Sequence, residues 1–116
     1  MTRFSDLLRP SPAGLYCPPG DFYIDPVRPV SRAVITHGHS DHARGGHGAV
    51  LATQETLAIM ECRYGPQSGG QPVVYGEEVR VGDVDVSFVP AGHVLGSAQI
   101  VLQYRGEKVV VSGDYK

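Results

Sequence analysis

The residues best suited to chemistry are crowded into positions 37–42. His37, His39 and His42 supply three imidazoles there, and Asp41 adds a carboxylate. Imidazole nitrogen and carboxylate oxygen are donors that zinc, manganese and iron accept in proteins. Side chains two positions apart in an extended chain project to the same side, so we expect His37 and His39 to bind one ion and Asp41 and His42 to reach a second. The cluster predicts a two-metal hydrolytic site.

The alternative for this cluster is a solvated polar loop. Histidines crowded so densely behind a buried strand have no stabilising purpose of their own, which argues against that alternative. Gly38 and Ser40 lie between the candidate ligands and are small enough to let the backbone bend tightly. Metal binding is therefore the interpretation we carry forward.

Two further candidates each follow a predicted strand. His93 is flanked by Gly92 and Gly96, but a lone histidine in this position is more often a surface residue or a satisfied core residue. Asp114 alone is typical of a turn, whereas beside two ions a carboxylate can bridge a separation of about 3.5 to 4 Å. Next to the cluster at positions 37–42, His93 becomes a candidate ligand and Asp114 a candidate bridge.

Asp25 and His47 are two further residues near the cluster. Asp25 precedes Pro26 at a predicted strand end, and two roles stay open for it: supporting the metal ligands from behind without touching a metal, or opening a plain turn. His47 lies between Gly46 and Gly48, which predicts an exposed, mobile loop, so it is left out of the ligand set.

The elements that must position these residues are mostly short strands. The apolar run at residues 33–36 is typical of a strand covered on both faces, and it leads directly into the histidine cluster. Thr53 is a plausible N-cap for a helix through residue 61, which Gly65 and Pro66 would end. Earlier strands are predicted at residues 15–17, 22–24 and 49–52.

From residue 73 the pattern predicts a hairpin-rich sheet. Its strands are expected at residues 73–75, 78–81, 84–90, 98–104 and 108–111. The fold class is therefore α/β (α+β), mostly β with one clear helix.

Length and composition set outer limits. The chain has 116 residues, which allows at most one ordinary domain, and a formal charge of -2, which shows no global basic field. We expect two sheets to need more chain than this, so the sequence reads as incomplete. Cys17 and Cys62 form no C-x-x-C pair, no signal peptide is seen and no run approaches about 20 apolar residues. These features predict reduced thiols and a cytoplasmic location without membrane insertion.

Three strings carry a resemblance to a known family. H-G-H-S-D-H at residues 37–42, A-G-H-V-L-G-S at 91–97 and S-G-D-Y at 112–115 strongly resemble motifs of the metallo-β-lactamase fold superfamily. The resemblance implies one ion held by His37, His39 and His93, another held by Asp41 and His42, a bridge from Asp114, and Asp25 as the acidic residue that buttresses the metal loop. The family also gives its second ion a further histidine, for which no residue after Asp114 is available here.

The flanking residues resemble the nucleic-acid-processing β-CASP branch. L-L-R-P and L-Y-C-P-P-G-D-F-Y-I-D-P look most like bacterial ligase-associated DNA exonucleases, which are grouped with mRNA 3′-end processing factors. The resemblance implies that residues 1–116 are the N-terminal half of an αββα sandwich, without the C-terminal half and the β-CASP insertion. It also implies a nucleic acid substrate, DNA rather than RNA, and functional association with a DNA ligase or helicase; the oligomeric state stays open.

The expected activity is metal-dependent phosphodiester hydrolysis of the DNA exonuclease type. Two divalent ions, with zinc favoured and manganese or iron open, would generate a hydroxide near neutral pH, and Asp41 would orient the water or accept its proton. Two alternatives remain. The same ligands serve a small-molecule thioester or lactam hydrolase, and a truncated chain lacking one ligand would be an inactive metal-binding fragment.

Overall fold

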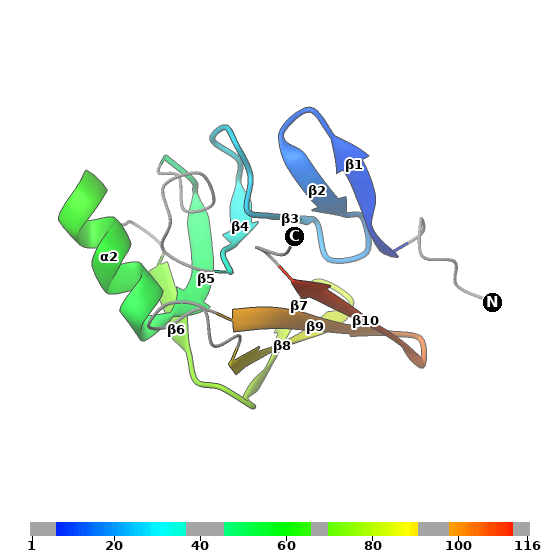
Figure 1. Cartoon of the computed structure of the whole chain (residues 1–116). Coiled ribbons are helices and arrows are strands. Elements are labelled where there is room, and N and C mark those ends of the chain that lie inside the picture. Colours follow the sequence, from blue (N-terminus) through cyan, green and yellow to red (C-terminus); the bar gives the residue numbers. More distant parts are fainter. Residues whose placement is uncertain (1–6, 37–45, 66–69, 91–97, 113–116) are drawn as a thin grey trace.

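The chain forms two β-sheets stacked face to face, with a helix against one of them. The computed structural model describes residues 7–36, 46–65, 70–90 and 98–112. The sheets contain six and four strands, in the orders β1-β2-β3-β4-β5-β6 and β10-β9-β8-β7. Figure 1 shows them as an upper and a lower layer, with α2 at the β5 side of the upper one. The expectation that 116 residues cannot supply two sheets is therefore wrong.

The six-stranded sheet is mixed. Its first three strands are antiparallel, while β3, β4, β5 and β6 pair in parallel. Parallel neighbours need crossover connections, and α2 provides the one between β5 and β6. The strands are β1 (Arg9–Ser11), β2 (Gly14–Cys17), β3 (Phe22–Ile24), β4 (Arg32–Val34), β5 (Ala49–Thr53) and β6 (Gly70–Val73).

The four-stranded sheet is an antiparallel meander in which apolar and polar residues alternate. Val84, Val86 and Phe88 of β8 are fully buried, while the residues between them are partly exposed. This alternation is expected for strands with one covered face. The strands are β7 (Glu78–Val81), β8 (Val84–Pro90), β9 (Ala98–Tyr104) and β10 (Glu107–Ser112).

Two hydrophobic cores hold the layers together. The larger lies between the sheets and includes Phe22, Val34, Phe88 and Ile100. The smaller lies on the other face of the six-stranded sheet, where Met60 of α2 (Gln54–Tyr64) packs with residues of β4 and β5. Because β4 contributes to both cores, it is covered on both faces, as its apolar sequence predicts.

The helix begins and ends where the sequence predicts. The Thr53 side chain accepts a hydrogen bond from the Thr56 backbone N–H, which makes Thr53 the N-cap. Gly65 follows the last turn with φ +86°, and its N–H donates to the Glu61 carbonyl. No helix within the described ranges is long and apolar enough to cross a membrane.

Several predicted boundaries differ from the structure. The strand expected at residues 33–36 ends at Val34, because the Thr36 N–H is bonded to the Asp25 side chain instead of to a neighbouring strand. The strand expected at residues 73–75 is β6, which ends at Val73 and pairs with β5 in the other sheet. Residues 74 and 77 instead bond to each other in a turn.

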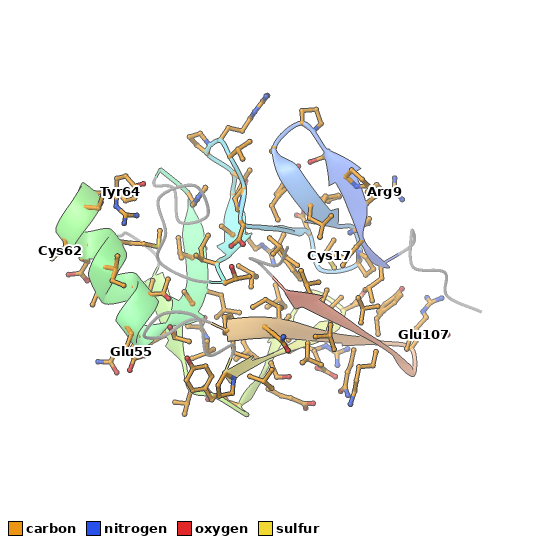
Figure 2. The ribbon with its side chains drawn as sticks, viewed as in Figure 1. Arg9, Cys17, Glu55, Cys62, Tyr64 and Glu107 are labelled. Atoms are coloured by element: carbon orange, nitrogen blue, oxygen red, sulfur yellow. The ribbon has the colours of Figure 1, made fainter. Side chains whose placement is uncertain are left out.

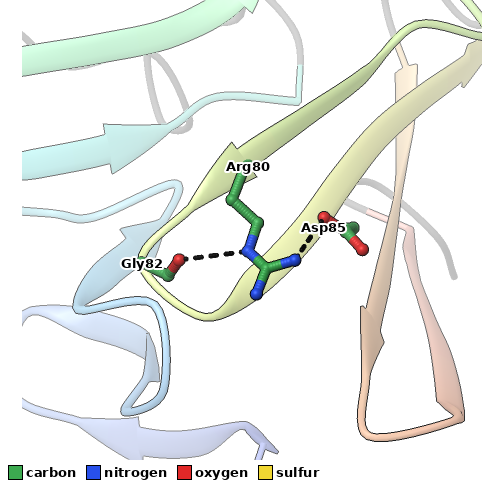
Figure 3. A network of polar contacts seen from close by, with 3 residues as sticks. All are labelled: Arg80, Gly82 and Asp85. Carbon is green, nitrogen blue, oxygen red and sulfur yellow. Dashed lines mark hydrogen bonds and ion pairs between the residues drawn. The ribbon is translucent and has the colours of Figure 1, made fainter.

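The hairpin between β7 and β8 closes against the other sheet. Gly82 has φ +58°, and the Asp83 N–H donates to the Pro19 carbonyl over 3.1 Å. Figure 3 shows Arg80 across this hairpin, donating to the Gly82 carbonyl and pairing with Asp85 at 3.3 Å. Both charged side chains are exposed, so the pair contributes little to stability.

Candidate metal centre

Strand ends from both sheets meet at one edge of the molecule. β3 and β4 are parallel, so their carboxyl ends, followed by Asp25 and Thr36, lie side by side. In the other sheet, Pro90 at the end of β8 pairs with Ala98 at the start of β9. Residues that follow aligned strand ends gather into one region, which is where ligands bind in sheets of this kind.

Asp25 joins β3 to the residue before the histidine cluster. Its Oδ1 accepts the Thr36 backbone N–H at 2.8 Å, and its Oδ2 accepts the Thr36 hydroxyl at 2.6 Å. The Asp25 N–H donates to the Val34 carbonyl at 2.9 Å. Asp25 adopts φ +47°, an uncommon backbone conformation that aspartate tolerates better than most residues. Three hydrogen bonds hold it there, and they fix the backbone one residue before His37.

A hydrogen bond between the sheets connects two of the candidate ligand segments. The Ala98 N–H donates to the Thr36 carbonyl at 2.8 Å. Thr36 precedes His37, and Pro90 and Ala98 bracket the segment that contains His93. The described residue before His37 and the one that follows the segment of His93 therefore lie in direct contact.

The last strand brings the described residues before the third segment to the same edge. In β10, Ser112 pairs with Gln99 of β9, which is one residue from Ala98. Asp114 follows Ser112 by two positions, so the chain leaves the described part of β10 beside the other strand ends. The topology thus gathers the approaches to all three ligand motifs.

The candidate ligands themselves lie outside the described residues, and their positions stay predictions. Among the residues that the structure describes, no group of three or more His, Cys, Asp or Glu could hold a metal ion. The residues concerned are His37, His39, Asp41, His42, His93 and Asp114. Asp25 is described, and its part beside a metal also stays a prediction.

His47 differs from its prediction. The exposed, mobile loop expected from its glycine neighbours is wrong, because His47 is only 7% exposed. Its Nδ1 accepts the Val30 backbone N–H at 3.2 Å. Sequence reasoning missed this role because the partner is a backbone group 17 positions away, which no local pattern reveals.

The two cysteines are free, as predicted. Figure 2 shows Cys17 between the sheets and Cys62 on α2. Cys17 is fully buried, and this burial raises the pKa of its thiol to about 11, while a backbone hydrogen bond at Gly20 acts weakly in the opposite direction. Cys17 is therefore a small core residue and not a reactive thiol.

Two known proteins are similar to this chain in sequence. The chain is 34% identical over 106 residues to a probable DNA ligase of Opitutus terrae, covering 89% of the chain and 10% of that protein. It is 33% identical over 119 residues to ribonuclease TTHA0252 of Thermus thermophilus, covering 80% of the chain and 27% of that protein. The chain thus spans about a tenth and about a quarter of the length of these relatives.

Solved structures show the same fold. A mutant of the CmlA β-hydroxylase matches 100% of this chain and 31% of its own, with a TM-score of 0.67 and 17% identity. A mutant metallo-β-lactamase of Cronobacter sakazakii matches 69% of this chain and 39% of its own, with a TM-score of 0.58 and 18% identity. At these identities the likeness concerns the fold alone.

A family model matches most of the chain. The model of the metallo-beta-lactamase superfamily matches residues 24–115, a stretch that begins at the end of β3 and includes every candidate ligand. This is a family of hydrolases whose members typically bind divalent metal ions. The chain therefore belongs to the metallo-beta-lactamase superfamily.

Proposed function

We propose that this chain supplies the metal ligands of a dinuclear phosphodiester hydrolase that acts on nucleic acid. The observation that carries the proposal is the hydrogen bond from the Ala98 N–H to the Thr36 carbonyl, because it joins the approaches to His37 and His93 across the two sheets. Neutral imidazoles and carboxylates suit a divalent ion such as zinc, manganese or iron. The chemistry of the donor set therefore fits the metals that this family binds.

The ligands divide between two ions. We assign His37, His39 and His93 to one ion, Asp41 and His42 to the other, and Asp114 to a bridging position. When bound, such a pair of ions supplies an activated water near neutral pH and offsets negative charge on a phosphate.

The chain's own residues would then orient the reacting groups. Asp41 can hold the attacking water by a hydrogen bond and accept its proton, because one carboxylate oxygen can ligate while the other accepts. Asp25 takes no part in proton transfer. Its two hydrogen bonds to Thr36 restrict the backbone from which His37 projects.

The substrate class rests on the relatives. Both curated proteins have names that refer to nucleic acid, one a probable DNA ligase and the other a ribonuclease. We propose DNA, with exonuclease activity and functional association with a ligase or helicase, as the flanking motifs predict. The free thiols support the cytoplasmic location predicted from the sequence.

Metal binding is the first test. We expect the purified chain to bind zinc or manganese in equilibrium dialysis with elemental analysis, and the double variant His39→Ala, Asp41→Ala to lose most of that binding while keeping its circular dichroism spectrum. Asp83→Ala changes an exposed carboxylate in the β7–β8 hairpin and should bind metal as the wild type does. A wild-type chain that binds neither metal contradicts the proposal.

Substrate class is the second test. The metal-loaded protein is incubated with end-labelled single-stranded DNA, double-stranded DNA and RNA, and in parallel with a chromogenic lactam and a thioester. We expect cleavage of DNA that the double variant does not show. Hydrolysis of only the lactam or thioester would instead identify a small-molecule hydrolase, and RNA cleavage without DNA cleavage would correct the substrate.

A further inference from the structure

The connection between β3 and β4, residues 25–31, contacts both ends of the segment that holds the histidine cluster. At one end, Asp25 accepts two hydrogen bonds from Thr36. At the other end, the Val30 N–H donates to His47 Nδ1, and the Val30 carbonyl accepts the Gly48 N–H at 2.9 Å. One short connection therefore fixes the described residues before and after positions 37–45.

The contact at the second end is tightly packed. A Cβ atom added to Gly48 would lie 2.8 Å from the Ser31 carbonyl oxygen, and one added to Gly46 would lie 3.2 Å from Pro29 Cγ. The Ala49 N–H also donates to the Ser31 carbonyl at 2.8 Å. Because so little space separates the two backbones, residues 46–48, which lead into β5, have one position relative to residues 29–31.

The imidazole of His47 has a chemical role that an apolar side chain cannot fill. A ring nitrogen that accepts an N–H carries no proton, so the Nδ1 contact indicates the neutral tautomer with its proton on Nε2. His47 is 7% exposed, so an apolar replacement would leave the Val30 N–H facing a side chain that cannot accept.

We propose that His47 is a positioning residue for the metal site. It acts through Val30, by fixing the distance between the two ends of the segment that carries His37, His39, Asp41 and His42. This inference rests on the proposed function, because it assumes that those residues bind metal. Fixing the ends of a segment lowers the entropy that is lost when its side chains gather round an ion. The contacts of residues 25–31 with the two ends of the segment therefore raise metal affinity.

The test compares three substitutions at one position. His47→Leu removes the acceptor. His47→Asn keeps it, because Asn Oδ1 is attached to Cγ as Nδ1 is in histidine. His47→Gln keeps a polar group but moves it to the place of Nε2. Zinc affinity of each folded protein is measured at pH 7.5 by competition with a chromogenic chelator, and stability of the metal-free protein by urea unfolding.

We expect about tenfold weaker zinc binding for His47→Leu and His47→Gln, the size of effect seen when residues behind metal ligands are changed. His47→Asn should bind within about threefold of wild type by the same reasoning. The control Val84→Ala shortens a fully buried side chain of β8, in the other sheet. It should lower stability without changing zinc affinity.

The outcomes separate the possibilities. Equal zinc affinity for wild type, His47→Leu and His47→Gln would overturn the inference and leave His47 a purely structural residue. Loss of affinity in His47→Asn as well would overturn it in favour of direct ligation by His47. If His47→Leu does not fold, the comparison of Asn with Gln decides. A wild-type chain that binds no zinc overturns the proposed function itself.

Discussion

Asp25 shows how one carboxylate can determine where a strand ends. It accepts both polar hydrogens of Thr36, a residue that is only 1% exposed. Asp25→Ala leaves a buried N–H without this acceptor and places alanine at φ +47°, so we expect a loss of about 2 to 4 kcal/mol in the free energy of unfolding. Urea unfolding at pH 7 measures it.

The matched variants separate hydrogen bonding from charge. Asp25→Asn keeps an acceptor for the Thr36 N–H and tolerates the positive φ, so it should lose less stability than Asp25→Ala. Asp83→Ala removes an exposed carboxylate and should stay within about 0.5 kcal/mol of wild type. Similar losses for Asp25→Ala and Asp83→Ala would show that the Thr36 contacts contribute nothing to folding.

The two cysteines should react very differently. Burial holds the pKa of Cys17 at about 11, so at pH 8 almost none of it is thiolate, and Cys62 is exposed. A disulfide reagent should therefore modify one thiol per native chain rapidly and the second only in urea, and Cys62→Ser should have no rapid thiol. Two rapid thiols in the native wild type would contradict the burial of Cys17.

The same pKa shift predicts a pH dependence. Because the Cys17 thiol ionises more readily in the unfolded chain than in the folded one, its contribution to stability is complete below about pH 9 and falls as the pH rises towards 11. Cys17→Ala should lose less stability than wild type across this alkaline range. An identical decline in both proteins would assign the effect to other groups.

At the level of single residues, the sequence indicates which side chains can bind a metal better than it indicates which side chains are buried. The donor set of the histidine cluster can be recognised because its spacing is local. The burial of His47 could not be predicted, since it depends on Val30, a residue distant in sequence. From the sequence, two roles stay open for Asp25 because its partner, Thr36, is 11 positions away and follows β4.

A substitution in the β7–β8 hairpin can test how the two sheets are joined. Gly82 has φ +58°, and a Cβ atom there would lie 2.8 Å from Gly20 Cα and 2.8 Å from the Pro19 carbonyl oxygen. Gly82→Ala therefore combines backbone strain with a clash between sheets, and we expect a loss of about 2 to 4 kcal/mol in the free energy of unfolding, measured in urea.

A second hairpin provides the control. Gly106, between β9 and β10, has φ +78°, and nothing lies within 4 Å of the Cβ atom that alanine would add. Gly106→Ala should introduce only backbone strain, which lowers the free energy of unfolding by about 1 kcal/mol. If Gly82→Ala is no more destabilising than Gly106→Ala, the contact between the hairpin and residues 19 and 20 is not tight in solution.

Elements with their own pattern were predicted well, and elements that depend on a partner were not. The alternation in β8 and the caps of α2 are local signals, and both elements form as expected. β1 and β6 contain Pro10 and Pro72 and have little strand character. They are edge strands, where proline is tolerated, and they form because β2 and β5 offer hydrogen-bonding partners.

At the scale of the molecule, the layered arrangement explains why the strand ends that lead to three separate motifs lie at one edge. The strand ends that lead to residues 37, 93 and 114 belong to both sheets, and the core between the sheets holds those ends together. The sequence predicted the motifs and the fold class. It did not predict that two sheets form within 116 residues, because β1 and most of β6 have little strand character in the sequence.

Because the proposed ligands come from both sheets, metal binding should stabilise the whole fold. A ligand at 100 times its Kd that binds only the folded chain adds about 2.7 kcal/mol to the free energy of unfolding. For a chain of this size, that corresponds to a rise in Tm on the order of 10 °C. We expect excess zinc to produce this rise in scanning calorimetry, and EDTA to reverse it.

The double variant His37→Ala, His39→Ala should show almost no rise, and calcium, which prefers oxygen ligands, should have little effect on the wild type. An equal zinc-dependent rise in the wild type and the double variant would mean that zinc binds elsewhere, and the two sheets would then be joined without any contribution from the metal.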